Sequence, residues 1–431
     1  MNSYFYDRII QRLRFYIRPG DSFRELDPPN ERFCSEFGSG ESEDHQSERL
    51  SEGGLNYLLL NGNVHREKDL IAFFRDRVSQ VSDPDTRVVV LFYSSLWRPL
   101  WKLANRFGWR TKSTLEENWV SPSDLRNLAE ICGFEEVRRD SGILCPIRIP
   151  LIDWIANRIF ANLPGVSALN WLNISILRKK SDWKERDDST PSVSVIIPAR
   201  NEAGNIEDAI RRLPVMGPND EIIFVEGNSS DDTWERIEAV VKNPGAGERR
   251  EVRAFRQDGK GKGDAVRKGF SEARREILMI LDADLTTPPE DMPYFYQSLI
   301  EDRGEFVNGN RLVLPMEDEA MRFLNLCGNK FFAVAFSIVL GQTLKDTLCG
   351  TKVLRKKHYE ELAKRRDLFG NFDPFGDFDL IFGAARMGLR IVEVPVRYRN
   401  RTYGETNISR WRHGMILLRM LVFATRRFRI W

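Results

Sequence analysis

Two aspartates at the end of an apolar run are the residues in this sequence best suited to chemistry. Residues 277–281 are all apolar, and Asp282, Ala283 and Asp284 follow directly. An unbroken apolar run beside charge is typical of a central parallel strand, and open α/β sheets bind ligands at the carboxyl ends of their strands. Two carboxylates there suit Mg²⁺ or Mn²⁺, which prefer carboxylate and phosphate oxygens. An acidic loop without a ligand is the alternative for so short a pattern, so the surrounding sequence must decide.

The segments before this pair repeat a strand, a polar loop and a helix. Strands are expected at 193–197 and 221–225, and glycines and lysines at 259–263 precede a third helix. Glycines and lysines at a helix N-terminus suit phosphate, so the repeat predicts a Rossmann-like nucleotide-binding half.

Five motifs in one order resemble the inverting family 2 glycosyltransferases with a GT-A fold. They are Pro198–Glu202, Glu226–Thr233, Gly259–Ala265, Asp282–Asp284 and Asn308–Arg311. Within that family the order is similar to the dolichyl- and polyprenyl-phosphate mannosyltransferases, over residues 192–425. The resemblance implies an α/β GT-A catalytic domain, a GDP-mannose or UDP-hexose donor, and a polyprenyl- or dolichyl-phosphate acceptor. It also implies a Mg²⁺ or Mn²⁺ cofactor held by Asp282 and Asp284, with Asp284 in the catalytic set.

The same resemblance implies the nucleotide-binding residues, which are Pro198, Ala199, Asn201, Glu202, Glu226, Asn228, Asp231, Lys262 and Asp264, together with Asp282 and Ala283. The loop from Pro198 to Glu202 is expected to hold the base and ribose, and Glu226 stands where the family usually has an aspartate that contacts the base. Lys262 and Asp264 would lie beside the ribose and diphosphate. Thr286 stands where the branch often has glutamine, so a water is expected to complete the metal shell.

The resemblance assigns four phosphate- or acceptor-binding residues downstream, and these are Arg311, Lys352, Arg401 and Asn407. Arginine suits bidentate contact with phosphate, although a lone arginine is more often part of a surface salt bridge. Lys352 replaces the usual arginine and Asn407 replaces the usual lysine of the branch.

Asp377 and Asp379 are the remaining candidate catalytic residues, at the start of an expected helix. If the acceptor is a sugar hydroxyl, Asp379 is the first candidate for the general base. If the acceptor is a lipid phosphate, its second pKa near 6 already leaves it largely ionised, and the two carboxylates would position groups instead. One of the two could also serve as an ordinary partner of a helix N-terminus.

Residues 408–431 predict a basic amphipathic helix. Ile408, Trp411, Met415, Leu418 and Val422 fall at helical spacing, and six arginines occur without an acid. Such a helix favours binding to a membrane surface, and a core-packing helix with a basic edge is the alternative. With no apolar run long enough to span a bilayer, we expect a peripheral protein on the cytoplasmic face of the membrane.

Residues 1–180 alternate strands and helices, with a helix in 1–20, a loop at 35–54 and two connecting helices in 151–177. The alternative for this last apolar segment is a membrane-facing hairpin. Segments 86–90 and 118–134 resemble the second half of a class I SAM-dependent methyltransferase, but residues 25–30 lack the glycines of the cofactor loop and contain two prolines. Glycine is needed there for close approach of the backbone to the cofactor. We therefore expect a truncated methyltransferase-like domain without SAM chemistry, a linker at 178–191 and a GT-A domain at 190–431.

Composition excludes some classes of function. The formal net charge of the 431 residues is +2, which excludes a strongly basic nucleic-acid-binding surface. The five cysteines are scattered and form no CxxC pair, so the sequence favours a reducing compartment without a zinc site. Three hypotheses remain: transfer to a polyprenyl phosphate, transfer to a glycan or other hydroxyl acceptor, and a non-catalytic scaffold. The intact acidic and arginine motifs disfavour the third.

Overall fold

The structure is a computed structural model that divides into two compact units. Unit 1 contains Met1–Ser181 with Arg386–Gly388 and Ala424–Trp431, and unit 2 contains Asp182–Ala385 and Leu389–Phe423. The structure describes residues 3–18, 21–28, 32–37, 56–99, 118–163, 165–181, 190–243, 245, 250–313, 323–364, 378–401, 403 and 410–428.

Unit 1 is built on a five-stranded sheet with the order β1-β2-β3-β5-β4. The strands are β1 (Ser22–Glu25), β2 (Asn56–Asn61), β3 (Thr86–Tyr93), β4 (Phe134–Gly142) and β5 (Leu172–Lys179). The first three strands are parallel, and β5 runs antiparallel to both β3 and β4. The β-branched residues of β3 are fully buried, as expected for a strand that is covered on both faces.

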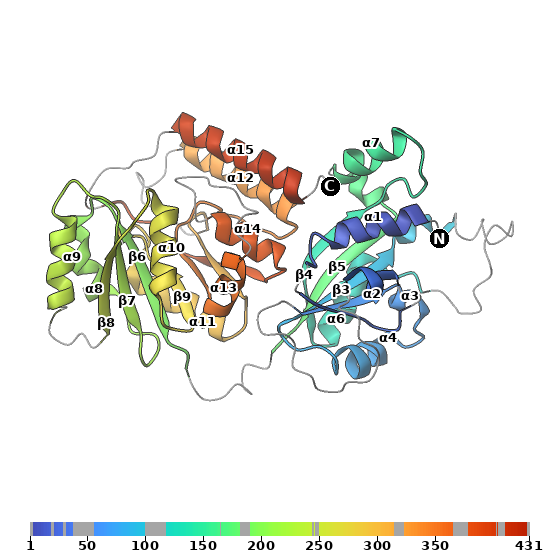
Figure 1. Ribbon diagram of the computed structural model, residues 1–431, viewed down its shortest axis with the longest axis horizontal. Coiled ribbons are helices and arrows are strands. Elements are labelled where there is room, and N and C mark those ends of the chain that lie inside the picture. Colours follow the sequence, from blue (N-terminus) through green and yellow to red (C-terminus); the bar gives the residue numbers. More distant parts are fainter. Residues whose placement is uncertain are drawn as a thin grey trace. The chain divides into compact units, whose positions relative to one another are not determined.

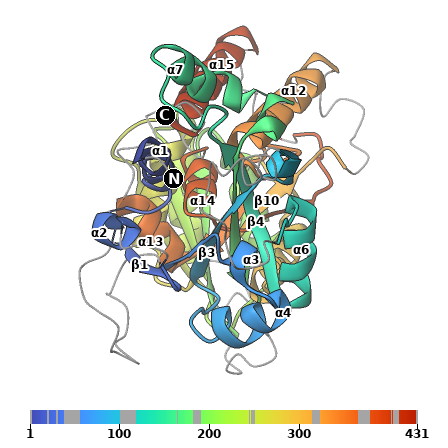
Figure 2. The same ribbon diagram turned by 90° about the vertical axis from the view of Figure 1, so that its right-hand side faces the viewer.

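Short helices cover both faces of this sheet (Figure 2). They are α1 (Ser3–Leu13), α2 (Arg32–Phe37), α3 (Asn63–Arg66), α4 (Leu70–Ala72), the π-helix Phe73–Val78, α6 (Pro122–Ile131) and α7 (Ile152–Arg158), with 3₁₀ turns at Ser95–Trp97, Phe160–Asn162 and Val166–Leu169. Helix α6 begins at a capping box, in which Ser121 and Asp124 each bond the backbone N–H of the other.

Three expectations for unit 1 need correction. The helix expected in 1–20 is α1, which already ends at Leu13. Residues 35–37 belong to α2 instead of a loop, and residues 38–54 lie outside the described residues. The second helix expected in 151–177 is wrong, because residues 172–179 form strand β5. An apolar run of this length has no decisive period, and pairing with β3 and β4 selects the strand.

Unit 2 contains a seven-stranded sheet with the order β12-β10-β11-β9-β6-β7-β8 (Figure 1). The strands are β6 (Val193–Ala199), β7 (Glu221–Glu226), β8 (Glu251–Arg256), β9 (Ile277–Ile280), β10 (Phe306–Asn310), β11 (Lys352–Arg355) and β12 (Ile391–Pro395). Strand β11 runs antiparallel to its neighbours β9 and β10, and the other six strands are parallel to one another. The six parallel strands therefore end at one shared edge, which we call the carboxyl edge.

The helices of unit 2 include members that pack on each face of the sheet. They are α8 (Ile206–Arg212), α9 (Thr233–Lys242), α10 (Lys262–Glu272), α11 (Met292–Ile300), α12 (Phe323–Leu340), α13 (Lys356–Lys364), α14 (Phe378–Arg386) and α15 (Arg410–Phe428). Helices α8, α9 and α11 share one core cluster with the side chains of Val193 and Val195. Helix α10 lies on the opposite face, where Gly269 approaches Ile196 so closely that a Cβ would lie 2.5 Å from its side chain. Within the described residues, no helix has the length and apolarity required to span a membrane.

Candidate nucleotide and metal site

Several predicted nucleotide-, metal- and phosphate-binding residues of unit 2 meet at the carboxyl edge. Each follows a different parallel strand: Glu202 follows β6, Asn228 follows β7, Lys262 follows β8, Asp282 follows β9 and Arg401 follows β12. The antiparallel β11 begins at the same edge and places Gly350 there. This edge is where open α/β sheets bind their ligands.

Asp282 is paired with the first residue of helix α10. Its Oδ1 forms a salt bridge with Lys262 Nζ, and about a quarter of each side chain is exposed. Gly350 lies against this pair so tightly that a Cβ at that position would overlap both the carboxylate and the amine. Glycine is therefore required for the backbone to approach the pair.

Asp284 is held by Thr286 on one side and by Arg401 on the other. Thr286 donates from its backbone N and its Oγ1 to Asp284 Oδ1, at 3.1 and 2.9 Å. Arg401 Nη2 donates to Asp284 Oδ2 at 2.7 Å. Thr286 thus orients the carboxylate in this structure, whereas the sequence suggested it as a weak donor in a metal shell.

Glu202 is the third carboxylate of the cluster and shares Arg401 with Asp284. Its Oε1 accepts from Arg401 Nη1 at 3.2 Å, and its Oε2 accepts from Asn205 Nδ2 at 2.7 Å. Burial raises the pKa of Glu202 to about 7, with Asp284 and Asp282 adding to the rise and Arg401 opposing it. The three carboxylates of the cluster thus share the two cations Lys262 and Arg401.

Tyr403 was not assigned a role by the sequence. Its hydroxyl donates to Asp231 Oδ2 at 3.4 Å, and its ring lies on Gly204, where a Cβ would come within 2.6 Å. Burial opposes ionisation of Asp231, but hydrogen bonds from Thr233 and Tyr403 outweigh it, so the pKa of Asp231 lies below its ordinary value. Arg401 and Tyr403 together fasten the segment after β12 to the loop after β6. A tyrosine in a polar loop gives no signal in the sequence that could have predicted this contact.

The loops after β6 and β7 are held together by their own polar side chains. Asn201 and Asn228 both have left-handed backbones, with φ of 57° and 58°. Asn201 Oδ1 accepts from Ser230 N at 2.8 Å. Glu226 is buried, and its Oε1 accepts from Ser229 N at 2.5 Å. The side chain of Glu226 therefore shapes the loop, and its contact with a base remains a prediction.

The other predicted nucleotide-binding residues lie close by. Pro198 and Ala199 are the last two residues of β6. Asp264 lies in the first turn of α10, and its Oδ2 accepts from Gly259 N at 2.9 Å. Ala283 is buried between the two aspartates.

Arg311 and Lys352, predicted to bind phosphate, are both engaged inside unit 2. Arg311 donates from Nε and Nη2 to the two oxygens of Asp346, at 2.7 and 2.8 Å. Burial opposes the ionised form, but Arg311 outweighs it and lowers the pKa of Asp346 to about 2. Lys352 is fully buried, and its Nζ donates to Cys349 O at 2.5 Å. Both cations have partners inside unit 2, and their phosphate-binding roles remain predictions.

Of the candidate catalytic residues Asp377 and Asp379, the structure describes Asp379. Asp379 is buried in the first turn of α14. Asp377 and Asn407 lie outside the described residues. The structure therefore brings Asp282, Asp284 and Glu202 together with Lys262 and Arg401, and leaves the predicted roles of Asp377, Asp379 and Asn407 as predictions.

The carboxylates suit the predicted Mg²⁺ or Mn²⁺ by their chemistry. Asp282 and Asp284 each direct an oxygen toward a positive side chain. Hard oxygens whose charge already requires a counter-cation are the donor set that these two metals prefer.

Comparison with known proteins gives the family. Glycosyl transferase family 2 matches residues 194–363. The dolichol-phosphate mannosyltransferase of Saccharomyces cerevisiae is 40% identical over 241 residues, which are 53% of this chain and 84% of that protein. The dolichyl-phosphate hexose transferase of Haloferax volcanii is 30% identical over 204 residues, which are 47% of this chain and 79% of that protein.

Two further similarities are more partial. The dolichol-phosphate mannosyltransferase of Pyrococcus furiosus is 30% identical over 225 residues, and this chain spans 59% of its length. A crystal structure of glucosyl-3-phosphoglycerate synthase from Mycobacterium tuberculosis with UDP covers 55% of this chain and 80% of that chain, with 20% identity and a TM-score of 0.39. The strong matches with the yeast and Haloferax proteins, together with the family match over β6 to α13, confirm the family predicted from the motifs and with it the GT-A class of unit 2. The chain belongs to glycosyl transferase family 2.

Proposed function

We propose that this chain transfers a hexose from a nucleotide sugar to a polyprenyl or dolichyl phosphate at a membrane surface. One observation carries the proposal: Asp282 and Asp284 are each paired with a cation from a different element, Lys262 from α10 and Arg401 from the segment after β12. The carboxylates suit a metal and the cations suit a diphosphate, so a bound metal and donor could replace the ion pairs of this cluster.

This replacement gives each residue a role with the donor. Asp282 and Asp284 would hold Mg²⁺ or Mn²⁺, which would stabilise the negative charge of the departing nucleoside diphosphate. Lys262 and Arg401 would turn from the carboxylates to the diphosphate oxygens. Gly350 would leave room for this rearrangement beside Asp282.

The nucleotide would lie across the loops after β6 and β7. Pro198, Ala199 and Asn201 border the first loop, and Asn228 and Asp231 belong to the second. The names of the relatives support mannose or another hexose as the transferred sugar, since they include a mannosyltransferase and a hexose transferase. The donor would then be GDP-mannose or a UDP-hexose. The carboxylates of Glu226 and Glu202 are then the groups suited to bond the base and the ribose.

A phosphate acceptor is supported by the relatives, which are named as dolichol-phosphate and undecaprenyl-phosphate transferases. Such a phosphate is largely ionised at neutral pH, so the attacking oxygen needs no general base. Asp379, with Asp377 beside it in the chain, would position the acceptor. Arg311 and Lys352 would support the wall of the site from inside, because their donors already serve Asp346 and Cys349.

Contact with a membrane is supported by outward-facing apolar stripes on two helices of unit 2. On α15, Met415, Leu418 and Val422 are exposed, while Leu417 and Met420 are buried. The described members of the stripe identified in the sequence, Met415, Leu418 and Val422, thus face outward, which favours membrane binding over the core-packing alternative. Helix α12 exposes Phe331, Val334 and Ile338 at the same spacing.

A donor screen with the purified chain tests the proposal. We expect GDP-mannose or a UDP-hexose to release its nucleoside diphosphate when both a short polyprenyl phosphate and Mg²⁺ or Mn²⁺ are present. Asp284→Asn should lower this rate by about a thousandfold, because it removes metal charge in the transition state. Glu290→Gln, which changes an exposed carboxylate paired with Arg212, is the matched control and should keep the rate.

Two results would contradict the proposal. A rate that depends on a glycan and ignores the lipid phosphate would establish the hydroxyl-acceptor reading, with Asp379 as the general base. A normal rate for Asp284→Asn at saturating metal would remove the metal assignment.

A further inference from the structure

Unit 1 contains a lobe whose exposed surface is dominated by large apolar side chains. The lobe comprises residues 143–171 and includes α7 and two 3₁₀ turns, between the end of β4 and the start of β5 (Figure 1). Nine of the 22 large hydrophobic side chains that are exposed in the described part of the chain lie between Ile147 and Leu169. Scattered exposed apolar residues need no explanation, but this concentration in 23 residues marks an interaction surface.

Helix α7 is amphipathic, but its polar face is turned toward the body of unit 1 and its apolar face is turned toward solvent. Its polar residues Asp153 and Asn157, four positions apart, face the body of unit 1. Asp153 accepts from the Tyr4 hydroxyl at 2.5 Å, and Asn157 exchanges hydrogen bonds of 2.8 and 2.9 Å with the backbone of Cys145. Ile152 and Trp154 are 59% and 48% exposed. Hydrogen bonds inside the unit thus hold the apolar face outward.

The residue that precedes α7 is held in a conformation unfavourable for its type. Leu151 has a φ of 69° and is 74% exposed. A leucine rarely adopts a left-handed backbone, and the structure around it must supply the energy that keeps it there. The chain therefore holds a large apolar side chain in the lobe without burying it.

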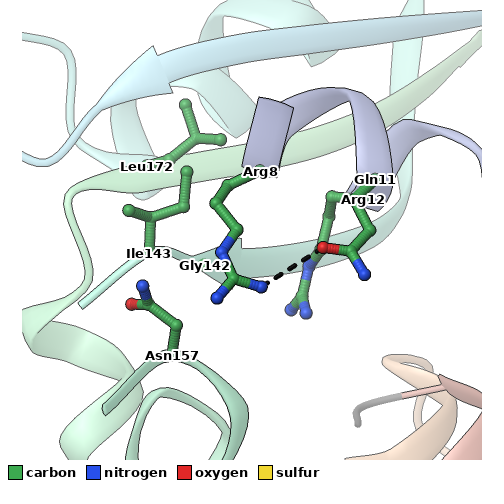
Figure 3. A pocket seen from close by; sticks show the side chains of 7 residues that line it. All are labelled: Arg8, Gln11, Arg12, Gly142, Ile143, Asn157 and Leu172. Carbon is green, nitrogen blue, oxygen red and sulfur yellow. Dashed lines mark hydrogen bonds between the residues drawn. The ribbon is translucent and has the colours of Figure 1, made fainter. Parts of the chain in front are cut away.

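The charge of the lobe is positive. Residues 143–171 contain Arg148, Arg158 and the single acid Asp153, which is buried. The Arg158 guanidinium lies 5.7 Å from the ring centre of Trp154. At the root of the lobe, a small pocket is lined by Arg8, Gln11, Arg12, Gly142, Ile143, Asn157 and Leu172 (Figure 3). Arg12 is paired there with Asp140 and Arg8 donates to Tyr4 and Gln11, so the exposed positive charge of the lobe comes from Arg148 and Arg158. Aromatic and aliphatic side chains beside arginines, with no exposed acid, complement an anionic lipid surface.

We propose that this lobe inserts into the headgroup region of an anionic bilayer and gives unit 1 a membrane contact of its own. The choice of a bilayer over a protein partner rests on the charge and on the proposed function, in which the acceptor is a membrane lipid. The contact is distinct from the stripes of α12 and α15, since it belongs to unit 1. It gives the truncated N-terminal unit a task that needs no cofactor.

Co-sedimentation of the full chain with vesicles tests the lobe. The probes are phosphatidylcholine vesicles with and without phosphatidylglycerol. Trp154→Ser with Phe160→Ser should reduce partitioning onto the anionic vesicles by about tenfold or more, because both side chains lose their burial in the interface. Arg148→Gln with Arg158→Gln should reduce the preference for anionic over neutral vesicles. Thermal melts followed by circular dichroism establish that each variant is folded.

The matched control is Val215→Ser with Tyr294→Ser, which removes two comparably exposed side chains, 66% and 60%, from unit 2. It should bind vesicles like the original chain. Equal binding by the folded lobe variant would overturn the inference. A dimer that the lobe variant converts to a monomer, with vesicle binding unchanged, would also overturn it and identify a contact between copies.

The same experiment separates this inference from the proposed function. Transfer to a lipid phosphate dispersed in detergent should be equal for the lobe variant and the original chain. If neither transfers to any lipid phosphate, yet the lobe variant loses vesicle binding, the proposed function fails and the lobe inference stands.

Discussion

At the scale of single residues, the site depends on how closely unlike charges approach. Three acids and two cations lie at the carboxyl edge, and Arg401 bonds two of the acids at once. Gly350 borders the Asp282–Lys262 pair. Acidic residues after β9 and a lysine at the start of α10 could be identified from the sequence, because each lies beside a recognisable strand or helix. The partner of each charge depended on loops far apart in the chain.

Gly350→Ala should abolish most of the transferase activity while leaving the fold intact. The added methyl group would displace the Asp282 carboxylate and the Lys262 amine, and misplacement by about 1 Å can cost about a hundredfold in rate. Steady-state assay of nucleoside diphosphate release measures the effect. Gly328→Ala is the control, since nothing lies within 4 Å of a Cβ there. Unchanged activity in Gly350→Ala would show that the Asp282–Lys262 contact does not matter for transfer.

The stability of the ligand-free protein should fall as the pH rises toward neutrality because of Glu202. Burial raises its pKa to about 7 in the folded protein, above the value in the unfolded chain. Between these two pKa values the folded protein binds more protons than the unfolded chain. The contribution of Glu202 to the free energy of unfolding is therefore complete below the unfolded pKa and is lost by about pH 7. It falls by no more than about 1.4 kcal/mol per pH unit.

Glu202→Gln removes the titratable carboxyl group and should therefore reduce the dependence of the free energy of unfolding on pH. Urea unfolding from pH 5 to 8 in chelator measures it, with the exposed Glu207→Gln as the control. Parallel stability curves for Glu202→Gln and the original chain would contradict the assignment.

The partners of Arg311 and Lys352 show what the sequence could not predict. Both follow or begin a strand, as the family motifs require. The sequence could not show that both carboxylate oxygens of Asp346 accept hydrogen bonds from Arg311, or that Lys352 is fully buried. Burial depends on loops and helices that pack over these positions from elsewhere in the chain.

At the scale of helices and strands, the hydrophobic period and the length of each segment determined whether it could be predicted. Strands β3, β6 and β9 are runs of β-branched and aliphatic residues, so their positions were predicted to within a few residues. Strand β5 was missed because Leu172–Lys179 lies in an aromatic, apolar segment that also suits a helix. The antiparallel direction of β11 has no local signal either, since direction follows from the path of the chain.

The ion pair between Arg311 and Asp346 should be a main support of the β10–β11 region. Asp346 is fully buried and also accepts from Asn329 Nδ2 at 3.0 Å. Asp346→Ala would leave a buried guanidinium unpaired and should lower the free energy of unfolding by about 3–5 kcal/mol. Guanidinium unfolding followed by circular dichroism measures this change.

The exposed pair of Arg211 and Asp208 offers the comparison. Asp208→Ala should change the same free energy by less than about 1 kcal/mol, since water screens exposed charges. Equal effects of Asp346→Ala and Asp208→Ala would show that the buried pair is not a support.

At the scale of the whole molecule, two sheets of different size share one chain. The seven-stranded sheet carries the family 2 motifs, and the five-stranded sheet carries the exposed lobe. The methyltransferase-like character of unit 1 remains a prediction from residues 86–90 and 118–134. The membrane contacts could be predicted only in part, because a sequence shows which residues are apolar and not which of them face outward.

Unit 1 should not bind SAM. Its loop after β1 contains Asp27 and Pro28 where the cofactor loop needs glycine, and proline removes a backbone N–H. Isothermal titration of the full chain with SAM should give no heat above dilution. A GDP or UDP titration of the same sample, which should give binding heat, establishes that the protein is competent. Micromolar affinity for SAM would contradict the truncated-domain prediction.

Arg401 forms hydrogen bonds with both Asp284 and Glu202, and this has a thermodynamic consequence. A divalent cation arriving alone must displace a positive side chain that then has no anionic partner, whereas a nucleoside diphosphate supplies that partner in the same event. Metal and nucleotide should therefore bind with positive cooperativity, and each should raise the affinity of the other by the same factor. Calorimetric titrations of Mn²⁺ with and without GDP or UDP measure this factor, and Arg401→Ala should reduce it toward one. The resting protein would then ignore free divalent ions and capture the metal as part of its donor.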